Sequence, residues 1–169
     1  LQAGTHVDTY VDEKTGITVF SLYGEHRKPT PEMLKDIDVL VMDIQDIGSR
    51  YYTYLYTMAY AMEACAENNK IFVLLDRINP IGGIEVEGNI LDTEYSSFVG
   101  MYPITNRYGL TMGELAMLFN KEFGIGCDLA VVELEGWKRG MYHIDTDLLW
   151  VSPSPNIPTL ETAVLYNGT

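Results

Sequence analysis

The sequence predicts an α/β protein: a Rossmann-like, three-layer domain with a mostly parallel sheet and helices on both faces. Short runs of apolar and β-branched residues alternate with longer segments whose apolar residues recur every three or four positions. Residues 38–43 and 71–75 are apolar almost throughout, which is typical of strands covered on both faces. The 169 residues, 47% of them apolar, suffice for one domain with its own core, so we treat residues 1–169 as a single domain.

The first half of the chain predicts alternating strands and helices. Residues 17–23 are rich in β-branched and aromatic side chains and predict the first strand. A Thr-Pro pair then opens a short helix over residues 31–36, followed by the strand at 38–43. Ser49 can cap a long helix over residues 50–68.

The second half continues this alternation after an interruption. The strand at 71–75 is followed by an irregular insertion over residues 80–107, with a small hairpin expected near its start. A Thr-x-x-Glu capping box opens a helix over 111–123, and residues 129–134 predict a fourth parallel strand. Right-handed crossovers would join these strands. The proline-containing stretch 150–158 should be extended.

Composition and motifs argue against several functions. Eleven basic and 24 acidic residues give a net charge of −13, which disfavours binding to nucleic acid or anionic lipid. No apolar run approaches the roughly 20 residues of a membrane span, so membrane insertion is not expected. Neither GxGxxG after the first strand nor GxxxxGK[ST] occurs, which disfavours nucleotide binding.

Histidine and cysteine spacing gives no reason to expect a metal or another cofactor. The three histidines, His6, His26 and His143, lack metal-ligand spacing. Cys65 and Cys127 belong to no Cys-x-x-Cys motif and are expected to be buried thiols, although a disulfide stays open.

Polar side chains follow the predicted strands, where ligands bind in open parallel sheets. They are Asp43, Gln45, Asp46, Arg50 and Tyr52 after one strand, and Asp76, Arg77 and Asn79 after the next. Carboxylates, amides and nearby aromatic rings suit a sugar site. Alternatives stay open: Asp43 and Asp46 could complement a helix dipole, and Asp76 with Arg77 could be an ion pair that shapes its loop.

Glu87 lies between Val86 and Gly88 in the insertion. A carboxylate presented into a cleft there would be desolvated and would suit a general acid; a solvated loop glutamate is the alternative. Glycoside hydrolysis commonly uses two carboxyl groups, whose separation the sequence does not give.

Several phrases, in order along essentially the whole chain, resemble the NamZ-like family of exo-β-N-acetylmuramidases. They include HVDTYVDEKTG, DIQDIGSRYYTY, LLDRINPIGG, VEGNILD, SFVGMYPITNRYGLTMGELA and SPSPNIPTLETA. The resemblance implies release of terminal β-linked N-acetylmuramic acid from the non-reducing end of peptidoglycan fragments. It also implies a Rossmann-like N-terminal domain, a smaller C-terminal domain as its partner, and a cleft between them.

The family pattern maps onto the residues above, with Glu87 and Asp46 as the candidate catalytic pair. The other positions are candidate substrate-binding residues, to which Arg107 is added. Two departures stand out: the upstream Phe-Gly-Pro-Glu-His-Gly motif, with its proposed catalytic glutamate, is absent from this sequence, and Tyr108 stands where His is frequent. The chain therefore reads as most of the N-terminal domain of a longer, secreted or periplasmic protein.

The substrate's lactyl carboxylate needs a positive partner. We expect Arg50, Arg77 or Arg107 to supply a bidentate contact. The rival interpretation is a carbohydrate-binding module that keeps the fold without turnover.

Overall fold

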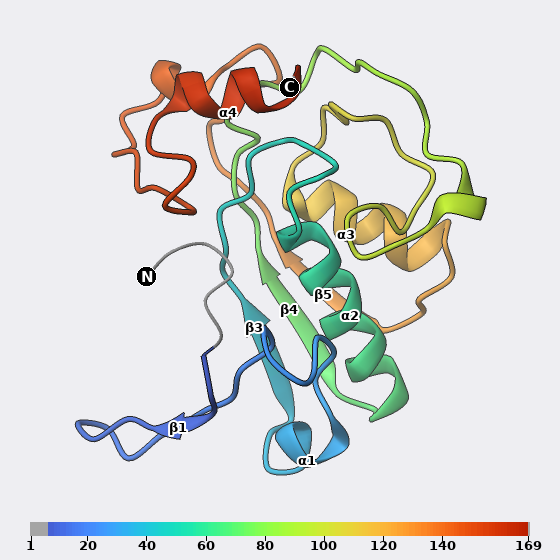
Figure 1. Cartoon of the computed structure of the whole chain (residues 1–169), viewed down its shortest axis with the longest axis vertical. Coiled ribbons are helices and arrows are strands. Elements are labelled where there is room, and N and C mark those ends of the chain that lie inside the picture. The colour runs from blue at the N-terminus through green and yellow to red at the C-terminus, as the bar shows by residue number, and fades with distance from the viewer. Residues whose placement is uncertain (1–6, 169) are drawn as a thin grey trace.

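The protein is described here by a computed structural model covering residues 7–168 (Figure 1). Its centre is a parallel sheet in the order β3 (Val39–Met42), β4 (Ile71–Leu75) and β5 (Asp128–Val132). Leu40, Phe72 and Leu129 share one register position, and Met42, Leu74 and Val131 share another. The α/β class with a parallel sheet that the sequence predicts is confirmed, because a parallel sheet packed against helices organises the described chain. No helix among residues 7–168 is long and apolar enough to cross a membrane.

One face of the sheet carries the core. Helices α2 (Tyr54–Glu67) and α3 (Met112–Lys121) contact each other and the sheet. The face that alternates through Met42, Phe72 and Leu74 lies in a single buried cluster with apolar residues of both helices. Both long helices therefore cover the same face.

The opposite face differs from the expected three layers, because it lacks a helical layer within the described part of the chain. Side chains on this face include Val39, Val41, Ile71 and Val132, which are 40%, 55%, 39% and 55% exposed. The continuous apolar runs predicted strands that are covered on both faces. The side chains on this face are apolar, as predicted, but the described helices cover only the other face.

The N-terminal region also differs from the sequence prediction. β1 (Tyr10–Val11) and β2 (Thr18–Val19) form a separate antiparallel hairpin, set apart from the main sheet in Figure 1. A turn closes it, in which the Thr15 backbone N–H donates to the Asp12 carboxylate and Gly16 adopts a φ of 71°. The expected strand at 17–23 was therefore wrong as a member of the parallel sheet, which has three strands.

The long helix begins later than expected, at Tyr54, and Thr53 occupies its cap position. Ser49 instead pairs with Arg107 in an isolated β-bridge, and the Arg50 N–H donates to the Asn106 carbonyl at 2.7 Å. The insertion thus pairs with residues 49 and 50, which form a bridge and a turn ahead of the helix. These contacts join residues 56 and 58 positions apart, so local capping patterns give no sign of them.

Short elements complete the chain. α1 (Pro31–Leu34) follows the expected Thr30 cap. The 3₁₀ turns η1 (Thr93–Tyr95) and η2 (His143–Asp145) interrupt the later loops. α4 (Leu160–Tyr166) lies beyond the carboxyl ends of the strands in Figure 1.

Cys65 and Cys127 are buried and free, as the thiol interpretation predicted.

Candidate functional site

The carboxyl edge of the sheet brings together two of the predicted residues, Asp43 and Arg77. Asp43 follows β3 and Arg77 follows β4, and Arg77 Nε lies 2.5 Å from Asp43 Oδ1. Their side chains remain 46% and 41% exposed. This is an accessible ion pair on adjacent strand ends, the place where ligands meet open parallel sheets.

The carboxylate of Asp76, the residue just before Arg77, accepts hydrogen bonds from other groups of the protein. Its Oδ1 accepts the backbone N–H groups of Arg77 at 2.8 Å and Gly113 at 2.7 Å. Its Oδ2 accepts the Thr111 hydroxyl at 2.9 Å. The carboxylate therefore caps the start of α3, and the predicted Asp76–Arg77 ion pair is replaced by Asp43–Arg77.

Asp46 lies in the interior, only 3% exposed. Its Oδ2 accepts the Gly48 N–H at 2.9 Å and a short hydrogen bond from the Tyr108 hydroxyl, while Oδ1 has no hydrogen-bond partner within residues 7–168. Burial raises the pKa of Asp46 to about 6. Burial and the neighbouring Asp46 carboxylate raise the pKa of Tyr108 well above its ordinary value. Asp46 is therefore buried and hydrogen-bonded to Tyr108, in contrast to the exposed Asp43.

Arg50 is likewise internal, at 5% exposure. Its Nη1 donates to the carbonyls of Asn89 at 2.8 Å and Ile104 at 2.7 Å. These bonds fasten the insertion to the sheet edge. The buried guanidinium is therefore a structural anchor through Nη1, while Nε has no hydrogen-bond partner among the described residues.

Asn79 and Gln45 also serve the backbone. Asn79 is 3% exposed; its Nδ2 donates to the Leu110 carbonyl at 3.0 Å and its Oδ1 accepts the Ile81 N–H at 3.2 Å. Gln45 Nε2 donates to the Ile78 carbonyl at 3.0 Å. Gln45 thus ties the loop after β3 to the loop after β4, and Asn79 ties the loop after β4 to the segment before α3.

Tyr52 belongs to a small second core near α4. Its ring meets those of Tyr54 and Tyr166 edge-on, with centroids 4.8 and 6.3 Å apart. It packs against a cluster that contains Ile47 and Ile157. Burial raises its pKa.

Glu87 and Arg107, both in the insertion, form a second ion pair. They pair through their backbones, and Arg107 Nη1 lies 2.7 Å from Glu87 Oε2. Arg107 Nη2 also donates to the Ile81 carbonyl at 2.5 Å and the Tyr142 hydroxyl at 2.8 Å. The Glu87 side chain is 62% exposed, so the desolvated setting expected for it is not present.

The predicted residues therefore divide into two kinds. Asp43, Arg77 and Glu87 offer charge to solvent, whereas the others are turned inward or hold loops together. Sequence reasoning missed Tyr142 as a partner of Arg107, and no sequence signal marks a contact across 35 residues. Tyr108 stood out only as a departure from the family pattern.

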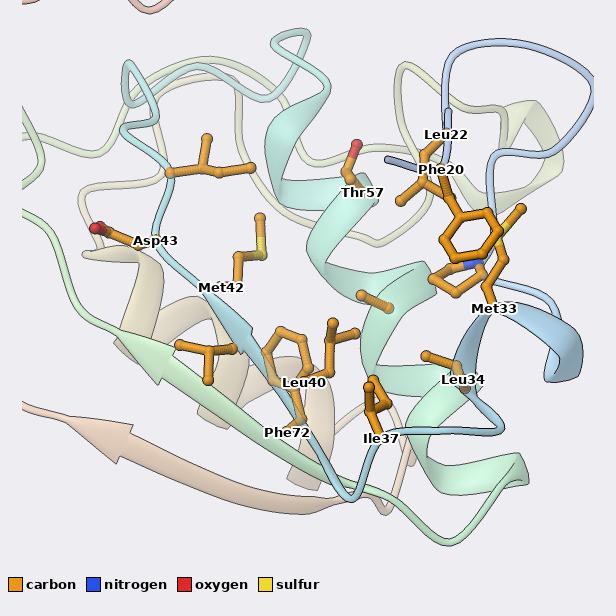
Figure 2. A pocket seen from close by; sticks show the side chains of 14 residues that line it. Phe20, Leu22, Met33, Leu34, Ile37, Leu40, Met42, Asp43, Thr57 and Phe72 are labelled. Atoms are coloured by element: carbon orange, nitrogen blue, oxygen red, sulfur yellow. The ribbon is translucent and has the colours of Figure 1, made fainter. Parts of the chain in front are cut away.

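An apolar hollow of about 570 Å³ adjoins Asp43 (Figure 2). It lies between α1, α2 and the outer strand β3, and side chains such as Phe20, Met33, Leu40 and Phe72 line it. Asp43 sits at its margin, and neither Asp76 nor Glu87 lines it. Apolar walls do not provide the hydrogen bonds that sugar hydroxyls need.

Metal binding finds no support in the described residues, since no group of three or more His, Cys, Asp or Glu side chains within 7–168 could hold an ion. His6 lies outside the described residues, and burial lowers the pKa of His143.

Fold and edge together define an α/β domain with charged and amide side chains at the carboxyl ends of a parallel sheet. Residues 1–161 match the family described as "Exo-beta-N-acetylmuramidase NamZ, N-terminal", and the chain belongs to this family. The family expected from the sequence is confirmed.

Individual relatives agree with this assignment. The chain is 60% identical over 168 residues to the peptidoglycan beta-N-acetylmuramidase NamZ of Bacillus subtilis (strain 168), covering 99% of this chain and 41% of that protein. Two crystal structures of DUF1343 family proteins from Bacteroides fragilis NCTC 9343 are similar. One has a TM-score of 0.89 and 56% identity over 92% of this chain and 41% of its own. The other has a TM-score of 0.82 and 38% sequence identity, and the match covers 93% of this chain and 43% of that one. The chain thus spans about two fifths of these relatives.

Proposed function

We propose that the protein is a glycoside hydrolase that releases terminal β-linked N-acetylmuramic acid from the non-reducing end of peptidoglycan fragments. The observation that carries this proposal is the 60% identity to a protein named a peptidoglycan beta-N-acetylmuramidase, extended over 99% of the chain. A C-terminal domain of the same protein would complete the cleft. A secreted or periplasmic location and a role in muropeptide recycling accompany this proposal.

Arg77 is our candidate for the lactyl carboxylate of the muramic acid. Arg50 donates to two backbone carbonyls in the interior, and Arg107 is 11% exposed and divided among three acceptors. Arg77 lies at the open strand ends, where its side chain is paired with the exposed Asp43. Its planar guanidinium could exchange Asp43 for a substrate carboxylate in a bidentate contact.

Glu87 is the candidate acid or base of this chain, because its carboxylate is accessible and Arg107 orients it. Asp46 stays a predicted catalytic residue, but its burial favours action through Tyr108 and Gly48, as a positioning residue. The buried Asp46 and the ion-paired Glu87 also favour, as second candidate, a module that binds cell-wall saccharide without cleaving it.

The test measures release of N-acetylmuramic acid from defined muropeptides by the whole protein. Glu87→Gln is compared with Glu85→Gln, an exposed neighbour two residues away. If Glu87 is the general acid or base, kcat falls by about 10²–10⁴-fold in the first and stays unchanged in the second. Equal activity of both variants would contradict the role of Glu87, and binding without any release by the unaltered protein would favour the binding module.

A separate comparison tests Arg77. Arg77→Ala should raise KM for the muramyl substrate while leaving an N-acetylglucosaminyl analogue unaffected, because only the former carries the lactyl carboxylate. Arg27→Ala is the control, since Arg27 stacks on Phe98 elsewhere. An equal loss on both substrates would contradict the proposed contact.

A further inference from the structure

A second hollow, about 440 Å³ in volume, lies beyond the carboxyl ends of β4 and β5. We call it the indole hollow; its lining includes Ile78, Trp137, Met141, Glu135, Asp145 and Asp147. Its volume is within the usual range of small-ligand sites. None of the residues assigned above as candidate substrate contacts lines it.

The indole hollow adjoins the exposed ion pair through the backbone. Ile78, in its wall, directly follows Arg77, and Gln45 fixes the Ile78 carbonyl from the loop after β3 at 3.0 Å. The ion pair and the hollow therefore share one backbone segment after β4. This is the edge of a parallel sheet where bound ligands are expected.

The chemistry of the lining is selective. Trp137 and Met141 supply an apolar surface, three carboxylates supply acceptors, and no basic side chain lines the hollow. A pyranose ring presents an apolar face to an aromatic ring and hydroxyl donors at its rim. An anionic ligand would meet repulsion from the local carboxylates in a chain of net charge −13.

The indole is held in place before any ligand arrives. Its Nε1–H donates to the Met141 carbonyl at 3.2 Å. A Cβ at Gly83 would lie 2.9 Å from the ring carbon Cη2, so the backbone approaches the ring closely. The Gly83 N–H also donates to the Arg139 carbonyl at 2.7 Å. A fixed ring loses little freedom on binding.

We infer that the indole hollow binds an uncharged sugar ring stacked on Trp137. Assigning this ring as the unit next to the N-acetylmuramic acid rests on the proposed function. The two positions would then differ in the charge of the sugar that they bind. Arg77 would bind the sugar that carries a carboxylate, and the acidic hollow would bind the neutral sugar.

The experiment titrates the whole protein with N-acetylglucosamine and, separately, with N-acetylmuramic acid, following the indole N–H signals by NMR. The signals of Trp137 and Trp150 are assigned by their loss in Trp137→Phe and Trp150→Phe. The expected result is a saturable shift of the Trp137 signal with N-acetylglucosamine, while the Trp150 signal stays in place. A Trp137 signal that does not move would overturn the inference.

A second experiment changes the charge of the hollow and leaves both tryptophans in place. Glu135→Gln combined with Asp147→Asn should weaken N-acetylglucosamine binding several-fold, because neutral groups accept weaker hydrogen bonds. Glu133→Gln, close by but outside the lining, should leave it unchanged. N-acetylmuramic acid should shift the Trp137 signal only weakly, and more strongly in the double variant. Equal binding of the two sugars, or equal effects of the double variant and the control, would contradict the inference.

These readouts do not depend on catalysis. Trp137 binding without release of N-acetylmuramic acid would refute the proposed hydrolase and leave the hollow intact. Release without any response of Trp137 would refute the hollow and leave the hydrolase intact.

Discussion

The carboxylate of Asp76 accepts the backbone N–H of Gly113 at 2.7 Å, so the residue that directly follows β4 also caps the start of α3. The same carboxylate accepts the Thr111 hydroxyl at 2.9 Å. A negative charge at a helix N-terminus is stabilising, and here the protein provides its own. The capping box of Thr111 and Glu114 and the cap by Asp76 therefore act on the same turn.

Gly113→Ala should destabilise the protein, although alanine is the better helix former. A Cβ at Gly113 would lie 2.7 Å from Asp76 Cγ and 2.8 Å from Val131 Cγ1. We expect a loss of about 1–3 kcal/mol in the free energy of unfolding by urea, typical of overpacking. Met117→Ala, on the exposed side of the same helix, should cost less than about 1 kcal/mol. An unchanged urea midpoint of unfolding for Gly113→Ala would show that Asp76 and Val131 shift to accommodate the added methyl group at little cost.

Asp46 makes stability depend on pH in an unusual direction. Its pKa is about 6 in the folded state against an ordinary 3.8, so the folded protein holds this proton more tightly than the unfolded chain. This stabilisation is fully present only below the ordinary pKa of 3.8 and is lost as the pH rises through about 6. Relative to Asp46→Asn, the wild-type protein should lose about 2 kcal/mol between pH 4 and 6, and about 3 kcal/mol in all.

The measurement for Asp46 is the difference in unfolding free energy between wild type and Asp46→Asn at several pH values. Tyr108→Phe is a useful companion, since removing the hydroxyl that stabilises the carboxylate should move the transition to higher pH. A difference that stays constant from pH 4 to 7 would mean that Asp46 is not desolvated in solution.

Arg107→Lys should be far more costly than Glu87→Gln. The guanidinium joins Glu87, the Ile81 carbonyl and the Tyr142 hydroxyl, a set that a single ammonium cannot span. We expect about 1–3 kcal/mol for Arg107→Lys in thermal or urea unfolding, and less than about 1 kcal/mol for Glu87→Gln, whose carboxylate is exposed. Similar costs for the two variants would indicate that the ion pair, and not the network, holds the insertion.

The thiols should react slowly in the native protein. Burial raises the pKa of Cys127 to about 11 and also raises the pKa of Cys65, and both side chains lie in the core. The thiolate is the reactive form, so a disulfide reagent should modify them at rates that follow opening of the structure. Labelling that is complete within seconds without denaturant would contradict this expectation.

Local sequence was sufficient for much of the fold. The apolar runs at 38–43 and 71–75 predicted β3 and β4 to within a residue or so, and the Thr111–Glu114 spacing predicted the start of α3. The thiol state of Cys65 and Cys127 followed from their apolar settings. These features depend on neighbours within one element, where period and capping chemistry act directly.

Tertiary structure alone decided which polar groups remained available. Asp43 and Asp46 are three positions apart after the same strand, yet one is exposed beside Arg77 and the other is buried and hydrogen-bonded to Tyr108. Sequence by itself determined that carboxylates would gather at the ends of consecutive strands. Whether each one faces solvent, a helix end or the core depends on segments 34 to 62 residues away, because only folding brings those groups within hydrogen-bonding distance.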